Sequence, residues 1–299
     1  MRLATYGPPG ERRAALRAES SLVDAEAAAA RAGVADAARW RDPMHVLAVD
    51  AAGRDRVVSA AFSLRDEGAA LAGDVRLGPP VPRPEKILCI GHNYRDHVAE
   101  TRRAEPTTPV VFAKFRNGLR GAHDEIPHPG VSDEIDWEGE LAIVIGRSLK
   151  RAAARDALDA VAGYMVFNDL SARDLQRSAS QWTAGKALDG FAPCGPELVT
   201  ADEVPDPAAL RLTTTVNGER MQDASTADMI FGLGEILEYL SSVMTLSPGD
   251  IVATGTPSGV GMGREPKRFL APGDVVEVSI AGLGATRNRI GARPEPAHA

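Results

Sequence analysis

The stretch from Glu138 to Gly146 has the sequence EGELAIVIG and places two carboxylates at the start of an apolar, β-branched run. Such a run is typical of a buried strand. Because residues two apart in a strand point to the same side, Glu138 and Glu140 would face one way and Leu141 and Ile143 the other. Two like charges so placed are costly to bury, and a divalent cation would neutralise them through their oxygens. The alternative is a pair of solvated glutamates at a strand end.

The composition is that of a globular protein. The chain has 299 residues, 44% of them hydrophobic and 25% charged, which is enough for one large domain or two ordinary ones. The net charge of −7 disfavours nucleic-acid binding, because an acidic surface repels phosphate. No apolar stretch of about 20 residues occurs, so we expect no membrane span. Cys89 and Cys194 lie far apart in apolar stretches, which predicts buried free thiols and fits a reducing compartment, here the cytoplasm.

A proline-rich segment divides the chain. Residues 79–84 contain four prolines, which cannot continue a helix or a central strand. We therefore predict a small N-terminal domain over residues 1–80 and a catalytic domain over residues 81–299. In the first part, alanine richness predicts a helix near residues 24–40, and the apolar runs 46–49 and 57–58 suggest strands.

The second part alternates strands and helices. Strands are predicted at residues 86–91, 110–114 and 162–168, and after the Pro-Gly-Asp turns at 248–250 and 272–274. A short helix is expected at 153–161. Apolar residues spaced by one and three predict a long helix over residues 227–246, with Ser225–Asp228 as its capping box.

A third carboxylate, Asp169, ends one of these predicted strands. Functional sites often gather residues from the ends of separate elements. Three carboxylates suit Mg²⁺, Mn²⁺ or Ca²⁺ better than zinc, since no His or Cys accompanies them. The alternative is that Asp169 or Asp174 only caps the following helix.

Three further features could take part in binding or catalysis. Lys186 lies in a Gly/Ala-rich stretch, where it would hold an oxyanion near a metal or else only extend along apolar surface. His97 and Glu100 are three residues apart, so they would adjoin on a helical turn. A carboxylate fixes the tautomer of an imidazole and raises its basicity, so the pair can take a proton from water; the alternative is an exposed helical contact. The glycine-rich residues 254–261 could bind an anion or form a plain turn.

Six stretches, in this order, resemble the fumarylacetoacetate hydrolase family over roughly residues 84–291. They are residues 90–100, 136–141, 163–174, 185–186, 216–219 and 246–261. Each is weak alone, and together they are specific. The resemblance implies an α+β, β-rich fold with a mixed β-sheet catalytic domain, a small N-terminal domain and a homodimer. It also implies Mg²⁺ or Mn²⁺, with Ca²⁺ as an alternative, held by Glu138, Glu140 and Asp169.

The same resemblance assigns expected roles to other residues. His97 and Glu100 match the family's water-activating dyad on a mobile lid, and Lys186 matches the lysine beside the metal. The substrate-binding positions that it implies are Arg173, Gln176 and Thr256. Two stretches depart from the family: Ala122-His123 stands where Gly-Pro is common, and residues 116–120, RNGLR, stand where small and hydroxyl residues are common. Both departures concern the substrate more than the metal.

The expected reaction is hydrolysis of a C–C bond in a small-molecule 2-oxo acid, a 2,4-dioxo acid such as an acylpyruvate, as in aromatic catabolism. A metal would polarise the substrate as a Lewis acid, and His97 would activate water. The same residues would also allow decarboxylation of oxaloacetate, isomerisation of an unsaturated dioate, or keto–enol tautomerisation. A binding protein that kept the scaffold is a non-enzymatic alternative, and the complete set of carboxylates, dyad and lysine argues against it.

Overall fold

The computed structural model describes residues 1–73 and 75–295, and its main layer is a mixed sheet of eleven strands. Its central path runs β3-β2-β1-β12-β10-β9-β15-β5-β6, with β4 beside β1 and β7 beside β12. The strands are β1 (Arg2–Tyr6), β2 (Arg13–Ala18), β3 (Ser21–Asp24), β4 (Leu77–Gly78), β5 (Ile87–Gly91), β6 (Val110–Lys114), β7 (Leu119–Arg120), β9 (Gly139–Ile145), β10 (Val161–Asn168), β12 (Ala192–Thr200) and β15 (Ile251–Ala253).

A second layer packs on β9, β10 and β12. It is a four-stranded antiparallel sheet in the order β14-β13-β16-β17. These strands are β13 (Arg211–Val216), β14 (Glu219–Ser225), β16 (Val275–Ile280) and β17 (Gly284–Arg289), and a small ladder pairs β8 (Ile135–Asp136) with β11 (Ser171–Ala172). The Pro-Gly-Asp turns precede β15 and β16 as predicted.

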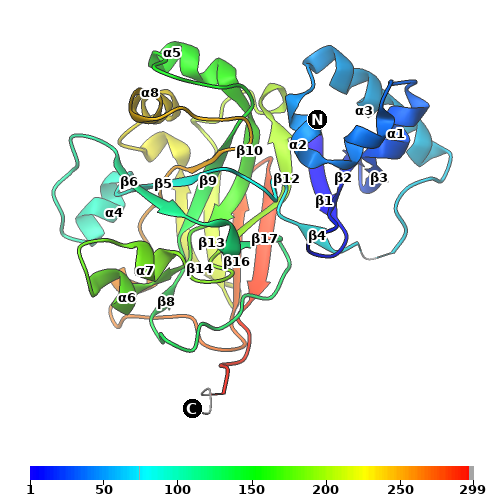
Figure 1. Ribbon diagram of the computed structural model, residues 1–299. Helices are drawn as coiled ribbons and strands as arrows, with labels where there is room; N and C mark the ends of the chain where they lie inside the picture. Colours follow the sequence, from blue (N-terminus) through cyan, green and yellow to red (C-terminus); the bar gives the residue numbers. More distant parts are fainter. Residues whose placement is uncertain (74, 296–299) are drawn as a thin grey trace.

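Helices cover the sheet on two sides. They are α1 (Ala25–Arg31), α2 (Pro43–Ala48), α3 (Ala51–Asp66), α4 (Arg95–Glu100), α5 (Ala154–Ala157), α6 (Arg173–Arg177), α7 (Thr183–Lys186) and α8 (Leu233–Val243). Figure 1 shows the first three, in blue, on one side of the molecule, and α4, α6 and α7 on the other. None of the described helices is long and apolar enough to span a bilayer.

The N-terminal part differs from the expectation in two places. The runs at 46–49 and 57–58, expected as strands, belong to α2 and α3, apart from Val49, which ends α2. Each helix begins at an aspartate: Asp42 accepts a hydrogen bond from the N–H of Met44, and Asp50 from that of Gly53. Such caps satisfy the free N–H groups of a first turn, so they select helix for short apolar runs. The alanine-rich segment forms α1 and a separate 3₁₀ turn, Ala37–Arg41.

The N-terminal strands continue the main sheet. Strand β1 pairs with β12, with Leu3 opposite Leu198. Leu3 and Leu16 share one buried apolar cluster with Phe167 and Ile251 from the later part of the chain. The domain boundary at residue 80 stays a prediction.

The helix expected over residues 227–246 is shorter than its apolar period indicates. The capping box of Ser225 and Asp228 closes only a 3₁₀ turn, Thr226–Asp228, and α8 starts after Gly232. Between them, the backbone N–H groups of Ile230 and Phe231 donate to the carbonyl and side-chain oxygens of Asn93. This tertiary contact holds the segment out of the helix.

Strands β9 and β10 form the antiparallel pair that positions the site. Glu140 lies opposite Phe167, and Gly139 lies opposite Asn168. Every residue of both strands is buried. The start of β9 and the end of β10 therefore meet at one end of the sheet. Cys89 and Cys194 are both buried and free, as predicted.

Candidate active site

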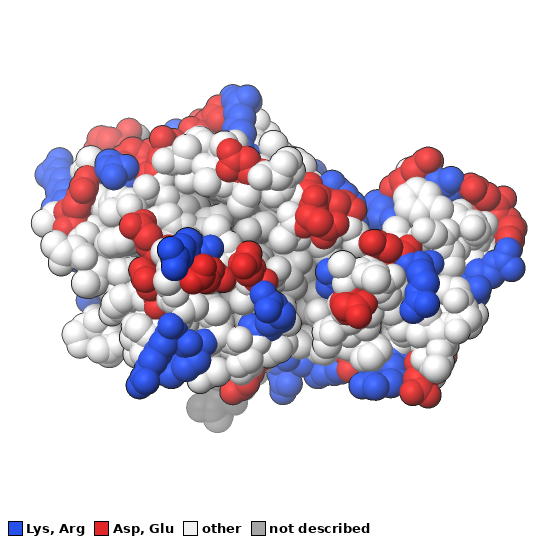
Figure 2. All heavy atoms as spheres, turned by 90° about the horizontal axis from the view of Figure 1, so that it is seen from above, with Lys and Arg blue, Asp and Glu red and all other residues white. Residues whose placement is uncertain are grey.

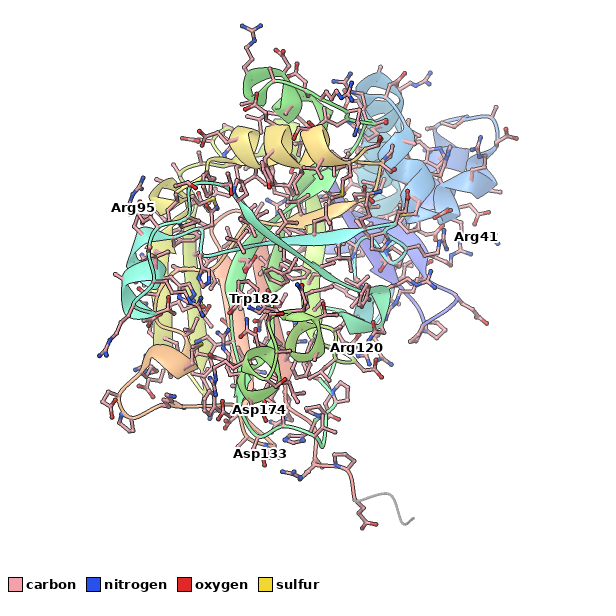
Figure 3. All side chains as sticks on the ribbon, turned by 60° about the vertical axis from the view of Figure 1, so that its left-hand side comes forward. Arg41, Arg95, Arg120, Asp133, Asp174 and Trp182 are labelled. Atoms are coloured by element: carbon pink, nitrogen blue, oxygen red, sulfur yellow. The ribbon has the colours of Figure 1, made fainter. Side chains whose placement is uncertain are left out.

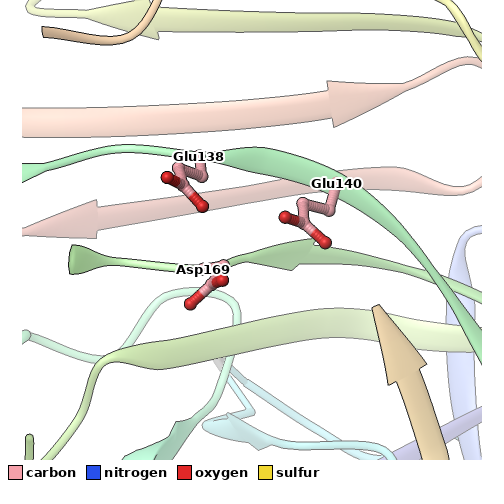
Figure 4. A group of neighbouring side chains, drawn as sticks. All are labelled: Glu138, Glu140 and Asp169. Atoms are coloured by element: carbon pink, nitrogen blue, oxygen red, sulfur yellow. The ribbon is translucent and has the colours of Figure 1, made fainter. Parts of the chain in front are cut away.

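Glu138, Glu140 and Asp169 converge at that end of the sheet, and we call them the carboxylate cluster. One oxygen from each lies within 4.8 Å of the others, and all three side chains are buried. Figure 4 shows the two glutamates on one stretch of chain and Asp169 facing them. The register explains the convergence, because Asp169 directly follows β10 and Glu138 directly precedes β9.

Two buried lysines contact the carboxylate cluster. Lys186 Nζ lies 2.7 Å from Glu138 Oε2 and 2.7 Å from Asp169 Oδ2. Lys114, at the end of β6, places Nζ 2.6 Å from Asp169 Oδ1. Lys186 was expected beside the metal site, whereas sequence reasoning assigned no role to Lys114. A lysine that ends the apolar strand VVFAK was the available signal, because a charge that is buried is normally paired.

Gly185 allows Lys186 to approach the carboxylate cluster. A Cβ at Gly185 would lie 2.6 Å from the carbonyl oxygen of Ala172 and 2.6 Å from the backbone nitrogen of Gln176. Helix α7 can therefore pack on α6 only without a side chain there. The Gly-Lys pair thus positions the ammonium group beside the carboxylates.

The charges of the carboxylate cluster are unevenly balanced. Burial raises the pKa of Glu140 well above its ordinary value, and the charges of Asp169 and Glu138 raise it further. Burial also acts to raise the pKa of Glu138, but Lys186 and Arg173 outweigh it and hold the pKa below its ordinary value. Glu140 thus carries the least compensated charge of the three.

The donor set fits a hard divalent cation. Within the part of the chain that the structure describes, Glu140 has no ion-pair partner and accepts one hydrogen bond, from the N–H of Gly255 at 2.9 Å. A buried carboxylate without a counter-ion is strongly disfavoured. Three oxygen ligands at this spacing suit Mg²⁺ or Mn²⁺, whose other positions go to water or substrate.

Arg173 supports the carboxylate cluster from a second side. Its Nε lies 2.8 Å from Asp136 Oδ2, and its Nη1 lies 2.6 Å from Glu138 Oε1. Asp136 in turn accepts the backbone N–H groups of Gly261 and Met262. Among the described residues, Arg173 Nη2 is buried without a partner. The guanidinium therefore holds Asp136 through Nε and Glu138 through Nη1, a structural role that sequence reasoning did not foresee.

The hydroxyl group of Thr256 makes two hydrogen bonds to other residues of the protein. Its hydroxyl donates to the carbonyl oxygen of Gly139 at 3.0 Å and accepts from Gln222 Nε2 at 2.8 Å. Its neighbour Gly255, with φ of +103°, turns its N–H toward Glu140. The glycine-rich segment 254–261 thus fastens to the start of β9.

The expected dyad is assembled on α4. His97 Nδ1 lies 3.0 Å from Glu100 Oε2, and Glu100 Oε1 accepts the N–H of Gly259 at 2.9 Å. The two side chains are 7% and 15% exposed, so the pair is not a surface contact. A Cβ at Gly263 would lie 2.3 Å from the Glu100 carboxyl carbon, so this approach also depends on a glycine.

His92 is a further cavity residue that the sequence did not single out. It has a left-handed backbone with φ of +56°, which is uncommon for a residue with a side chain. Its ring stacks on His97 with centroids 6.1 Å apart and meets the edge of Trp182 at 5.4 Å. Burial lowers the pKa of His92 to about 4, so the ring is neutral at pH 7. No local pattern in the sequence announces this conformation.

One cavity of about 340 Å³ joins these groups. Every site residue expected from the sequence lines it except Glu100 and Asp169, which lie behind His97 and Lys186. Trp182 also lines the cavity, and Figure 3 shows it near the middle of that face of the molecule. A proton acceptor, a candidate cation site and cationic side chains thus surround one volume suited to a small molecule.

Comparisons with known proteins agree with this geometry. The family model for the fumarylacetoacetate (FAA) hydrolase C-terminal domain matches residues 86–291. The chain belongs to the fumarylacetoacetate hydrolase family, and it is an enzyme of the α+β, sheet-rich fold that the resemblance implied.

The similar proteins carry the names of several related activities. The chain is 46% identical over 213 residues to the mitochondrial oxaloacetate tautomerase FAHD2B of Bos taurus, a match that covers 71% of this chain and 68% of the relative. It is 46% identical over 222 residues to the oxaloacetate tautomerase YisK of Bacillus subtilis, covering 73% and 74%. A solved maleylpyruvate hydrolase from Sphingobium, in complex with manganese(II) and pyruvate, is 31% identical, with a TM-score of 0.76 and coverage of 98% and 100%.

Proposed function

We propose that this enzyme is a metal-dependent keto–enol tautomerase of a short 2-oxo dicarboxylic acid of the oxaloacetate type. The observation that carries the proposal is that His97 and two members of the carboxylate cluster, Glu138 and Glu140, line the same cavity. Tautomerisation needs only a proton acceptor beside a polarised carbonyl. The curated relatives named above support this order, which places tautomerisation ahead of the C–C hydrolysis expected from the sequence.

The carboxylate cluster would hold the cation, Mg²⁺ or Mn²⁺, with Ca²⁺ as a third candidate. Bound there, the ion would withdraw electrons from the carbonyl group of a 2-oxo acid and so acidify its neighbouring C–H bond. Lys186 lies within 2.7 Å of two of the three carboxylates. Its ammonium group would stabilise the negative charge that develops on the substrate oxygen.

His97 would carry the proton. The contact with Glu100 fixes the Nδ1–H tautomer, which leaves Nε2 as the basic nitrogen. His97 takes a proton from C3 of the oxo acid and returns it to the oxygen on C2, so the substrate gains and loses no atoms. The N–H of Gly259 holds Glu100 and hence the imidazole in place.

The substrate's second carboxylate would meet Arg173 and Gln176. The side-chain oxygen of Gln176 accepts from Arg173 at 2.9 Å, which leaves its amide NH₂ as a donor on the cavity wall. Arg173 also lines the cavity, and its Nη2 has no hydrogen-bond partner among the described residues. A substrate contact by Thr256 stays a prediction. Its hydroxyl already makes two hydrogen bonds within the protein, to the carbonyl oxygen of Gly139 and from the side chain of Gln222.

Oxaloacetate itself provides the test. The decay of the absorbance of its enol form, measured with protein loaded with Mn²⁺ and corrected for the uncatalysed rate, should accelerate. His97→Ala should remove the acceleration while Mn²⁺ binding persists. Acceleration that is unchanged in His97→Ala would refute the assigned base, and no acceleration by the wild-type protein would refute the substrate class.

C–C hydrolysis of a 2,4-dioxo acid is the second candidate. The buried His97–Glu100 contact is also the arrangement that activates water, and the solved manganese complex is of a protein named maleylpyruvate hydrolase. Incubation with a panel of acylpyruvates, followed by mass spectrometry, should detect two acids if hydrolysis occurs. Pyruvate formed from oxaloacetate would instead indicate decarboxylation.

The homodimer, the cytoplasmic location and the role in aromatic catabolism stay predictions. Sedimentation of the protein in solution would test the homodimer.

A further inference from the structure

Five arginines gather around a cleft that is separate from the catalytic cavity. The cleft has a volume of about 640 Å³, contains a single acidic lining residue, Asp124, and shares no lining residue with the catalytic cavity. We call it the arginine cleft, and its cationic residues are Arg12, Arg76, Arg83, Arg116 and Arg120. The last two come from the stretch at residues 116–120 that departs from the family pattern.

The positive charge in the arginine cleft is only partly compensated. Asp124 is shared, at 2.8 Å from Arg76 and 3.7 Å from Arg12. Arg83 pairs with Asp42 at 2.7 Å. Within residues 1–73 and 75–295, Arg116 and Arg120 have no ion-pair partner. On the face shown in Figure 2 the two charge signs are interspersed, which makes this concentration in a chain of net charge −7 unusual.

Arg12 is built into the floor of the cleft. Its side chain is only 8% exposed, and its Nη1 has no hydrogen-bond partner among the described residues. A Cβ at Gly78 would lie 1.9 Å from this nitrogen, so the guanidinium lies directly against the backbone of β4. Burial lowers the pKa of Arg12, and the charge of Arg76 lowers it further. A buried cation with its donors incompletely used is stabilised by an added negative charge.

We propose that the arginine cleft binds a small soluble polyanion, a compact molecule with two or more carboxylate or phosphate groups. Guanidinium groups bind both kinds of group through paired, charge-assisted hydrogen bonds. The volume of the cleft is within the range usual for small-molecule sites. A multivalent ligand would engage Arg116 and Arg120 at the rim together with the buried charge of Arg12.

Calorimetric titration of the full-length, metal-free protein tests this proposal at low ionic strength. Inorganic pyrophosphate and citrate serve as the phosphate and carboxylate probes, and acetate at equal ionic strength serves as the monovalent comparison. We expect at least one of the two polyanions to bind and acetate not to. The double variant Arg116→Ala/Arg120→Ala should weaken that binding about tenfold or more, since it removes two charge-assisted contacts.

A matched control removes the same charge elsewhere. Lys150→Ala/Arg155→Ala changes two exposed cations next to and on α5, so it should leave the affinity unchanged. If the double alanine variant does not fold, Arg116→Glu alone, at an exposed position, should abolish the binding. The proposal is overturned if neither polyanion binds, or if both double variants lose affinity equally. It is also overturned if Arg116→Ala/Arg120→Ala changes only the sedimenting mass, which would make the cleft an interface between copies of the chain.

Discussion

The backbone N–H of Asp169 donates to the carbonyl oxygen of Glu138 across 2.9 Å. This bond continues the β9–β10 ladder by one step beyond the end of β10. It holds two carboxylates side by side although they lie 31 positions apart in the sequence, and Lys186 then bridges their side chains. The spacing of the carboxylate cluster thus follows from strand register, not from flexible loops.

Because the charge of Glu140 is weakly compensated, we predict that one substitution of this residue has opposite effects on stability with and without metal. Glu140→Gln removes a buried charge but keeps the shape of the side chain. In EDTA, the variant should melt at a higher temperature than the wild type, because the unpaired carboxylate destabilises the metal-free fold. With Mn²⁺, only the wild type should gain stability, by ~2.7 kcal/mol at about 100 times Kd. Calorimetric melting of both proteins measures this, and equal stabilisation of both by Mn²⁺ would count against Glu140 as a ligand.

Substitutions in the His97–Glu100 pair should lower the tautomerisation rate to different extents. Glu100→Gln keeps a hydrogen bond to His97 but loses the charge that orients and polarises it, so the tautomerisation rate should fall about a hundredfold. His97→Ala should fall at least as far. Neither change should alter Mn²⁺ affinity, because neither residue belongs to the carboxylate cluster. A full rate in Glu100→Gln would show that His97 does not depend on its partner.

The buried ion pair of Lys114 with Asp169 leads to a prediction about stability that the sequence did not suggest. Lys114→Met keeps the length of the side chain but leaves Asp169 without one of its two buried cations. Breaking a buried ion pair from one side typically costs about 3–5 kcal/mol, so the metal-free melting temperature should drop. Mn²⁺ should restore part of that loss. The exposed Lys267→Met is the control and should melt like the wild type.

His92 predicts a difference in acid stability. Its pKa is about 4 in the folded protein against an ordinary 6.5, so the unfolded chain takes up a proton that the folded protein refuses. Stability is therefore unaffected by this group above pH 6.5, and it falls as the pH drops from 6.5 to 4. In His92→Asn, which tolerates a left-handed backbone, the fall should be shallower. Parallel pH series of denaturant melts measure the difference, and superimposable slopes would contradict the assigned pKa.

The two glutamates of the carboxylate cluster were predictable because their pattern is local, and the family resemblance implied that Asp169 joins them. The spacing of Glu138 and Glu140 fixes their common side, and Asp169 ends a strand that its β-branched and apolar neighbours already indicated. The contact of Lys114 with Asp169 was not predictable in the same way. It depends on the order β9-β15-β5-β6 across the sheet, which no local pattern encodes.

The errors in secondary structure have the same origin. Short apolar runs such as residues 46–49 do not distinguish strand from helix by period alone, and the caps Asp42 and Asp50 were the decisive signal. The helical period near residue 230 was real in the sequence, but hydrogen bonds to Asn93 hold that segment outside α8. The left-handed His92 and the packing of Trp182 on it arise only from the folded chain.

Anomalous scattering from crystals grown with Mn²⁺ tests the central claim most directly. We predict one strong peak per chain at about 2.1–2.3 Å from oxygens of Glu138, Glu140 and Asp169, with Lys186 moved away from at least one of its two carboxylates. A map without a peak there, in which Lys186 still bridges Glu138 and Asp169, would contradict it.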